Sequence, residues 1–112
     1  MKPDHTQLAE FAGDPFEVAE LLGYQDGAIV SRTLVDREQA TVTVFALDAG
    51  QTISEHTAPH EALLQILDGE ARISIADDSY TVRAGEGLVF PSETPHALAA
   101  DKRFKMLFTM IR

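Results

Sequence analysis

Short runs of apolar or alternating residues recur along most of this 112-residue chain, with turn signals between them. Strands this brief, separated by segments such as Asp-Ala-Gly, Asp-Asp-Ser and Arg-Ala-Gly, are typical of an antiparallel sandwich or barrel. We therefore predict an all-β fold. The expected strands are residues 28–35, 41–47, 63–67, 71–76, 79–83, 87–90, 97–100 and 104–111.

Composition limits the partners and the location of the protein. A chain of this length suits a single domain, and the lack of cysteine excludes disulfides and thiolate metal sites. The polar amino terminus and the lack of a long apolar run predict no leader peptide, no membrane span and a cytoplasmic location. A net charge of −9 disfavours nucleic acids and anionic membranes as partners, because their phosphates would be repelled.

The residues before the strands predict a short helix. Asp14 is suited to cap it, Pro15 to occupy its first position, Glu17 to complete a capping box and Gly23 to end it. A helix of about two turns is unstable alone, so its apolar stripe must pack on the rest of the protein. That stripe consists of Val18, Leu21 and Leu22.

Two blocks rich in glycine and histidine stand fifteen residues apart. The first spans residues 50–69 and contains His56 and His60, and the second spans residues 85–96 and ends at His96. The glycines at the block ends suit places where a strand turns. Asp-Gly at the end of the first block, between two apolar runs, predicts a hairpin there.

Both blocks resemble the paired signatures of the cupin superfamily, and the match extends over roughly residues 41 to 111. The resemblance implies a double-stranded β-helix, that is, a jelly-roll barrel. Residues 41–112 would then form the barrel, and residues 1–40 an arm with the short helix and one strand, packed on the barrel.

The resemblance also implies that His56 and His96 point into the barrel and hold one divalent transition metal ion. Two further ligands of metal-binding cupins are replaced here, the second histidine by Ala58 and the glutamate by Ala62. His60 has the right parity to be a third ligand, although Pro59 disrupts the strand just before it. His5, in the polar amino-terminal segment, is expected to have no role in the site.

The two alanines would widen the interior and make it less polar, which favours a small-molecule pocket. The candidate wall residues are Ala58, Ala62, Gln65, Met106, Phe108 and Met110, and core packing explains the larger ones equally well.

Three functions from different classes remain open. The first, which we favour, is a barrel that binds a small organic molecule and has a reduced metal site. The second is a metal-dependent enzyme, an oxygenase or isomerase, that uses His56 and His96. The third is a structural or regulatory dimer with a vestigial pocket. A homodimer is expected because residues 104–111 are apolar on both faces and residues 28–35 add another apolar run.

Overall fold

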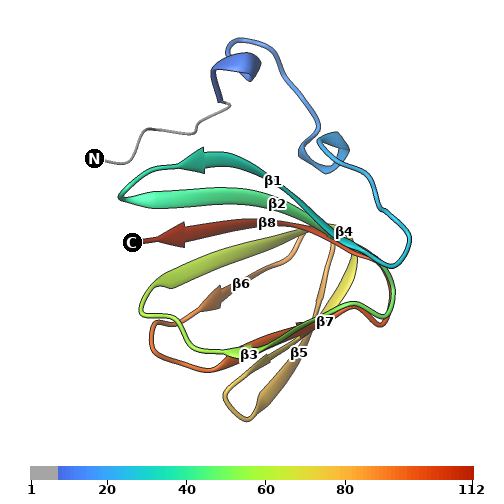
Figure 1. Cartoon of the computed structure of the whole chain (residues 1–112), viewed down its shortest axis with the longest axis vertical. Helices are drawn as coiled ribbons and strands as arrows, with labels where there is room; N and C mark the ends of the chain where they lie inside the picture. Colours follow the sequence, from blue (N-terminus) through green and yellow to red (C-terminus); the bar gives the residue numbers. More distant parts are fainter. Residues whose placement is uncertain (1–7) are drawn as a thin grey trace.

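A curled antiparallel sheet of eight strands forms the body of the described chain (Figure 1). The computed structural model describes residues 8–112. The fold confirms the predicted all-β class. The strands are β1 (Ile29–Asp36), β2 (Ala40–Leu47), β3 (Thr52–His56), β4 (Glu61–Ile75), β5 (Asp78–Arg83), β6 (Gly87–Phe90), β7 (His96–Ala99) and β8 (Phe104–Ile111).

The longest strand, β4, joins the two halves of this sheet. Its first part pairs with β8 and β6, and its second part pairs with β7 and β5. The strand order is β1-β2-β8-β4-β7-β3. Because β4 belongs to both halves, the sheet folds over on itself, with β2 and β8 on one side and β3 and β7 on the other (Figure 1).

The hairpin predicted at Asp68 and Gly69 is wrong, because β4 runs through both residues. The two strands expected at residues 63–67 and 71–76 are therefore one. Gly69 has a φ of 75°, and a Cβ at this position would collide with the carbonyl oxygen of Arg103. Glycine is needed here because the chain entering β8 approaches the backbone closely, and not because the chain turns.

The predicted two-turn helix is replaced by two single turns of 3₁₀-helix, η1 (Leu8–Phe11) and η2 (Val18–Glu20). Glu17, and not Asp14, occupies the N-cap position of η2, and its side chain makes no capping hydrogen bond. A segment this short gains few backbone hydrogen bonds, so the packing of its side chains decides its conformation. Neither turn has the length that a bilayer crossing requires, and His5 lies outside the described residues.

The apolar stripe of the arm packs on the outer side of β1 and β2. Val18, Leu21 and Leu22 contact a cluster of buried residues that includes Leu34 and Val44. This cluster is separate from the main core inside the barrel. The arm therefore covers part of the sheet that would otherwise face water.

The last strand, β8, is buried on both of its faces over its first half. Phe104 and Met106 belong to the main core, whereas Leu107 packs in the outer cluster. The amine of Lys105 donates a hydrogen bond of 2.7 Å to the carbonyl oxygen of Ala19 in the arm. The apolar character of this strand on both faces is thus explained in part within one chain.

Candidate functional site

His96, the first residue of β7, points into the barrel and is only 5% exposed. Its ring stacks on that of Phe90 in β6, with centroids 4.2 Å apart and an interplanar angle of 15°. Its Nδ1 lies 3.1 Å from the carbonyl oxygen of Thr94, in the loop before β7. The stacked ring and the hydrogen bond together set the orientation of the imidazole.

His56, the last residue of β3, faces His96 directly across the two strands. A bulge interrupts the pairing between Ile53 and His56, so simple alternation does not hold along this short strand. The Nδ1 of His56 lies 3.0 Å from the carbonyl oxygen of Ser54, and its side chain is exposed. The structure therefore brings together the two histidines singled out in the sequence.

The two imidazoles meet edge to face, with their Nε2 atoms 3.1 Å apart. A carbonyl oxygen only accepts hydrogen bonds, so each Nδ1 must carry a proton. A hydrogen bond between the Nε2 atoms then requires a third proton, whereas two neutral imidazoles carry only two. The arrangement is complete only when the pair holds one extra proton or a cation.

The two histidines differ in how well they tolerate that charge. Burial lowers the pKa of His96 below its ordinary value of 6.5, the hydrogen bond with Thr94 opposes this, and the charge of a protonated His56 lowers the pKa again. His56, by contrast, is exposed. His96 is therefore suited to the neutral form, in which its Nε2 can accept a hydrogen bond.

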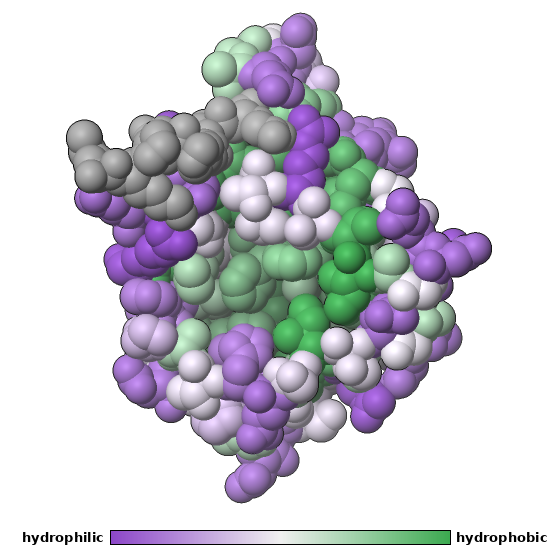
Figure 2. All heavy atoms as spheres, in the orientation of Figure 1, coloured by the Kyte–Doolittle hydropathy of each residue, from purple (hydrophilic) through white to green (hydrophobic). Residues whose placement is uncertain are grey.

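A cavity of about 240 Å³ adjoins this pair inside the barrel. Hydrophobic side chains also surround a hollow on the face of the molecule seen in Figure 2. The wall residues of the cavity come from β2 and β8, from β3 and β7, and from β6. Its wall consists of Phe45, Ile53, His56, Phe90, His96, Leu98, Met106 and Phe108.

Met106 and Phe108 thus line the cavity, whereas the other four candidate wall residues, Ala58, Ala62, Gln65 and Met110, are not among its lining residues. Gln65 is exposed, because β4 alternates and turns Ala62 and Leu64 inward and Gln65 outward. Met110 packs against the main core but is not part of the cavity wall.

The remaining wall residues were missed in the sequence. The alternation of residues 41–47 places Phe45 on the same face as Leu47, which is fully buried, and this signal could have identified it. Leu98 alternates in the same way with His96 along β7. No comparable signal marked Ile53 or Phe90.

Ala58 lies in the connection between β3 and β4, where its carbonyl oxygen accepts a hydrogen bond from the Glu93 amide. Ala62 is buried in the main core. His60 lies in the bend before β4, and within residues 8–112 no third His, Cys, Asp or Glu joins the pair to form a metal-ligating group.

Two imidazole nitrogens aimed at one point suit a transition metal, and each ring is held through its Nδ1 as metal-binding histidines usually are. Catalytic metal centres generally use three protein ligands, however, and this donor set supplies two. The residues described here therefore do not form a complete centre of that kind.

The chain is thus a small antiparallel β-barrel in which a pair of histidines faces an apolar interior cavity. A family model described as "Cupin domain" matches residues 43–111, and the chain belongs to this family.

Solved structures agree with this assignment. The chain resembles a conserved protein of unknown function from Streptococcus pyogenes, with 41% identity, a TM-score of 0.76, and coverage of 79% of this chain and 77% of that one. A cupin superfamily protein from Desulfitobacterium hafniense has 27% identity, a TM-score of 0.84, and coverage of 88% and 91%. A cupin 2 conserved barrel domain protein from Leptotrichia buccalis has 36% identity and a TM-score of 0.84, over 87% of this chain and 47% of that one. No curated protein matches the chain.

Proposed function

We propose that the protein binds a small organic molecule inside the barrel, with His56 and His96 as the polar anchor. The composition of the cavity wall carries this proposal: six apolar side chains surround one pair of imidazoles. Small-molecule sites typically combine such a wall with a few polar groups that fix the orientation of the ligand.

The cavity also indicates the kind of molecule that fits. Its volume of about 240 Å³ is below the roughly 300 to 1,000 Å³ of pockets for drug-sized ligands. Phe45, Phe90 and Phe108 contribute aromatic surface. An acceptor group on the ligand can receive the shared Nε2–H proton in place of the second imidazole. We therefore expect a compact, mostly apolar molecule with one acceptor group.

Thermal melting with benzoate, phenol and benzyl alcohol as probes tests this function. A probe present at about 100 times its Kd should raise the Tm by roughly 10 °C for a domain of this size. His96→Ala should reduce the shift strongly because it removes half of the anchor. His60→Ala is the matched control and should leave the shift unchanged.

The outcomes of this test are distinct. A shift that His96→Ala abolishes supports the interior site. No shift with any probe, or an equal shift in the His96→Ala variant, would contradict it and favour a structural or regulatory barrel with a vestigial pocket.

A second candidate function is that of a metal-dependent enzyme, an oxygenase or isomerase. The observation that favours it is the pair of Nε2 atoms 3.1 Å apart, each left with a lone pair when the rings are neutral. Elemental analysis of protein purified without chelators or a nickel column tests it. One transition metal ion per chain would favour the enzyme, whereas metal-free protein that binds the organic probes would exclude a resident metal.

A further inference from the structure

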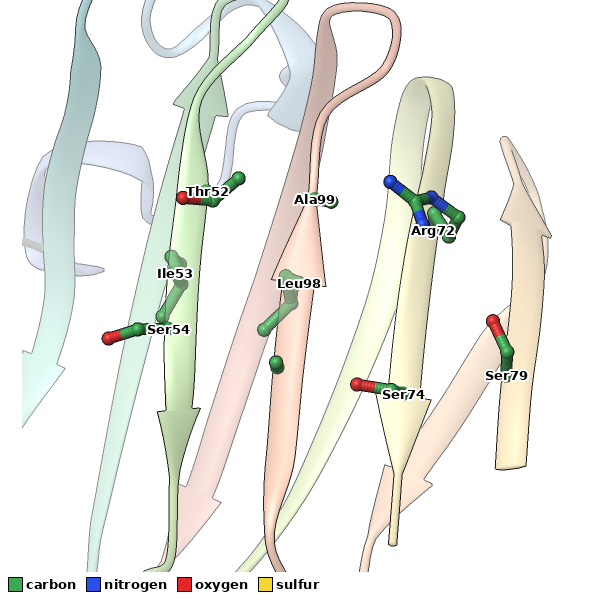
Figure 3. Close-up of a pocket in the computed structure, with 9 residues that line it drawn as sticks. Thr52, Ile53, Ser54, Arg72, Ser74, Ser79, Leu98 and Ala99 are labelled. Carbon is green, nitrogen blue, oxygen red and sulfur yellow. The ribbon is translucent and has the colours of Figure 1, made fainter. Parts of the chain in front are cut away.

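A trough with both polar and apolar lining lies on the outside of the barrel, on the opposite face of β3 and β7 from the imidazole pair. Its volume is about 270 Å³. Along β7 the buried His96 and Leu98 alternate with the half-buried Ala97 and Ala99, which point outward into the trough. The outer trough is lined by residues of β3, β7, β4 and β5: Thr52, Ile53, Ser54, Arg72, Ser74, Ser79, Ala97, Leu98 and Ala99 (Figure 3).

The register of the strands explains why the surface is hollowed. Ala99 lies between Thr52 on β3 and Arg72 on β4 in one cross-strand row. In the next row, Ala97 is opposite Ser74, and Ser74 is opposite Ser79. The middle strand thus carries methyl groups while its neighbours carry larger polar side chains. Figure 3 shows Ala99 between Thr52 and Arg72.

The walls of the trough carry unused hydrogen-bonding groups. The side-chain hydroxyls of Thr52, Ser54, Ser74 and Ser79 make no hydrogen bond to other groups of residues 8–112. Each of these hydroxyls can donate one hydrogen bond and accept two. The trough therefore has an apolar floor and walls that both donate and accept.

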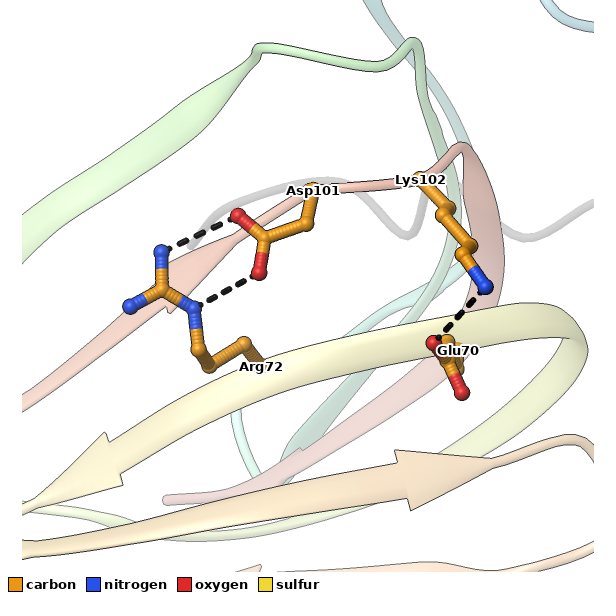
Figure 4. A network of polar contacts seen from close by, with 4 residues as sticks. All are labelled: Glu70, Arg72, Asp101 and Lys102. Atoms are coloured by element: carbon orange, nitrogen blue, oxygen red, sulfur yellow. Dashed lines mark hydrogen bonds and ion pairs between the residues drawn. The ribbon is translucent and has the colours of Figure 1, made fainter.

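Arg72, at one end of the trough, is held in place and its charge is balanced. Its Nε and one terminal nitrogen donate hydrogen bonds of 2.8 and 3.0 Å to the carboxylate of Asp101 (Figure 4). The neighbouring Lys102 is paired with Glu70 at 3.4 Å. The guanidinium keeps three N–H donors that Asp101 does not use, while the pair as a whole is neutral.

We propose that the outer trough binds a neutral polyhydroxylated molecule the size of a single sugar ring. Each hydroxyl of such a molecule donates and accepts, which matches the serine and threonine walls and the neutral Arg72–Asp101 pair. The C–H face of the ring would lie on the methyl groups of Ala97 and Ala99. An anion fits less well, because Asp101 already neutralises Arg72 and the chain carries a net charge of −9.

NMR titration of ¹⁵N-labelled full-length protein tests this site, with D-glucose, D-galactose and myo-inositol as probes and inorganic phosphate as the anionic comparison. At least one polyol should shift the backbone amides of Ser74, Ala97 and Ala99 with a Kd in the millimolar range. Saturation by phosphate at lower concentration than by any polyol would overturn the proposal. So would the absence of saturable shifts with all three polyols.

Two variants test whether the polyol binds in the trough itself. Ala99→Leu fills the floor and should abolish the shifts, and Ser54→Ala with Ser74→Ala should weaken binding by about tenfold, because two hydrogen bonds are lost. Ser31→Ala, an exposed serine on β1, is the matched control and should bind like the parent. Unchanged affinity in both trough variants would overturn the proposal.

The interior site and a self-association surface give different results in the same experiment. His96→Ala should leave polyol binding unchanged, since its side chain lies on the other face of the sheet. Shifts of the trough amides on dilution alone, without polyol, would assign this face to a second copy of the chain and would also overturn the proposal.

Discussion

The histidine pair defines the site at the scale of single residues. Each Nδ1 is committed to a backbone carbonyl, so the chemistry of the site resides in the two Nε2 atoms and the proton or cation between them. Burial lowers the pKa of His96 and so disfavours its charged form. The stability of the fold should therefore depend on pH.

We expect the free energy of unfolding to fall as the pH drops below about 6.5. Burial lowers the pKa of His96 in the folded protein, so the unfolded chain takes up this proton more readily. The contribution of neutral His96 to the free energy of unfolding is therefore complete above the pKa that His96 has in the unfolded chain. It is lost as the pH falls toward the pKa that His96 has in the folded protein. Thermal melting across this range measures it.

Histidine variants identify the source of this pH dependence. His96→Asn should flatten the dependence between about pH 7 and pH 5, and the matched variant His60→Asn should leave it unchanged. An equally steep loss of stability in His96→Asn would show that other groups cause it.

Restoring the two ligands that the alanines replace should create a metal centre. Ala58→His with Ala62→Glu should raise the affinity for a divalent transition metal by roughly 10-fold to 100-fold, because four ligands replace two. Ala62 is buried, so the new carboxylate should lower the Tm when no metal is present. Calorimetry and melting with and without the ion measure both effects, and equal affinity in parent and variant would contradict the expectation.

The sequence was informative about which histidines meet, because both lie at matched positions of the two blocks. The candidate wall list did not use one available signal: Gln65 is three positions from Ala62, so strand alternation places the two on opposite faces. The need for a third proton between the two Nε2 atoms could not be predicted. It follows from the positions of two backbone carbonyls, which no sequence pattern encodes.

At the scale of elements, β4 is the strand on which the barrel depends. It pairs with four other strands, and Gly69 is the point where the chain entering β8 comes closest to it. Gly69 therefore has a left-handed backbone conformation and no room for a Cβ atom.

Gly69→Ala should destabilise the protein by about 3 to 4 kcal/mol, through backbone strain and a clash with the Arg103 carbonyl. Gly50→Ala is the matched control, since Gly50 also has positive φ but nothing lies within 4 Å of its added Cβ. It should lose only about 1 to 2 kcal/mol. Chemical denaturation measures both, and equal losses would contradict the assigned role of Gly69.

Most strands were predictable because alternation or continuous apolar runs mark them. β3 was not, because only Ile53 is apolar among its five residues. The N-terminal helix was predicted from capping residues, yet packing of the arm on the barrel outweighs capping in a segment this short.

At the scale of the whole molecule, part of the outer face of the sheet remains apolar beyond the arm. Leu63 of β4 and Val89 of β6 are direct cross-strand partners and are 41% and 52% exposed. Ile111 of β8 is 54% exposed. Because the arm already covers β8 near Lys105, this smaller patch is the surface that a second subunit would bury.

We expect a homodimer that uses this patch. Sedimentation at micromolar concentration should give twice the chain mass of 12.2 kDa. Leu63→Glu should produce the monomer, because a charge in an apolar interface is costly. Tyr80→Glu, at an exposed residue on β5, is the control and should remain dimeric. A monomeric parent would exclude this interface.

The methionine methyl groups allow the most direct test of an interior binding site. The chain has three methionines, of which Met106 lines the cavity, and Met110 packs against the same core without lining it. In protein labelled at the methionine methyl carbons, saturating benzoate, phenol or benzyl alcohol should shift the Met106 resonance strongly and the Met110 resonance little, with Met106→Leu providing the assignment. A Met106 resonance that stays unmoved by all three probes would contradict the claim that the barrel interior is a binding site.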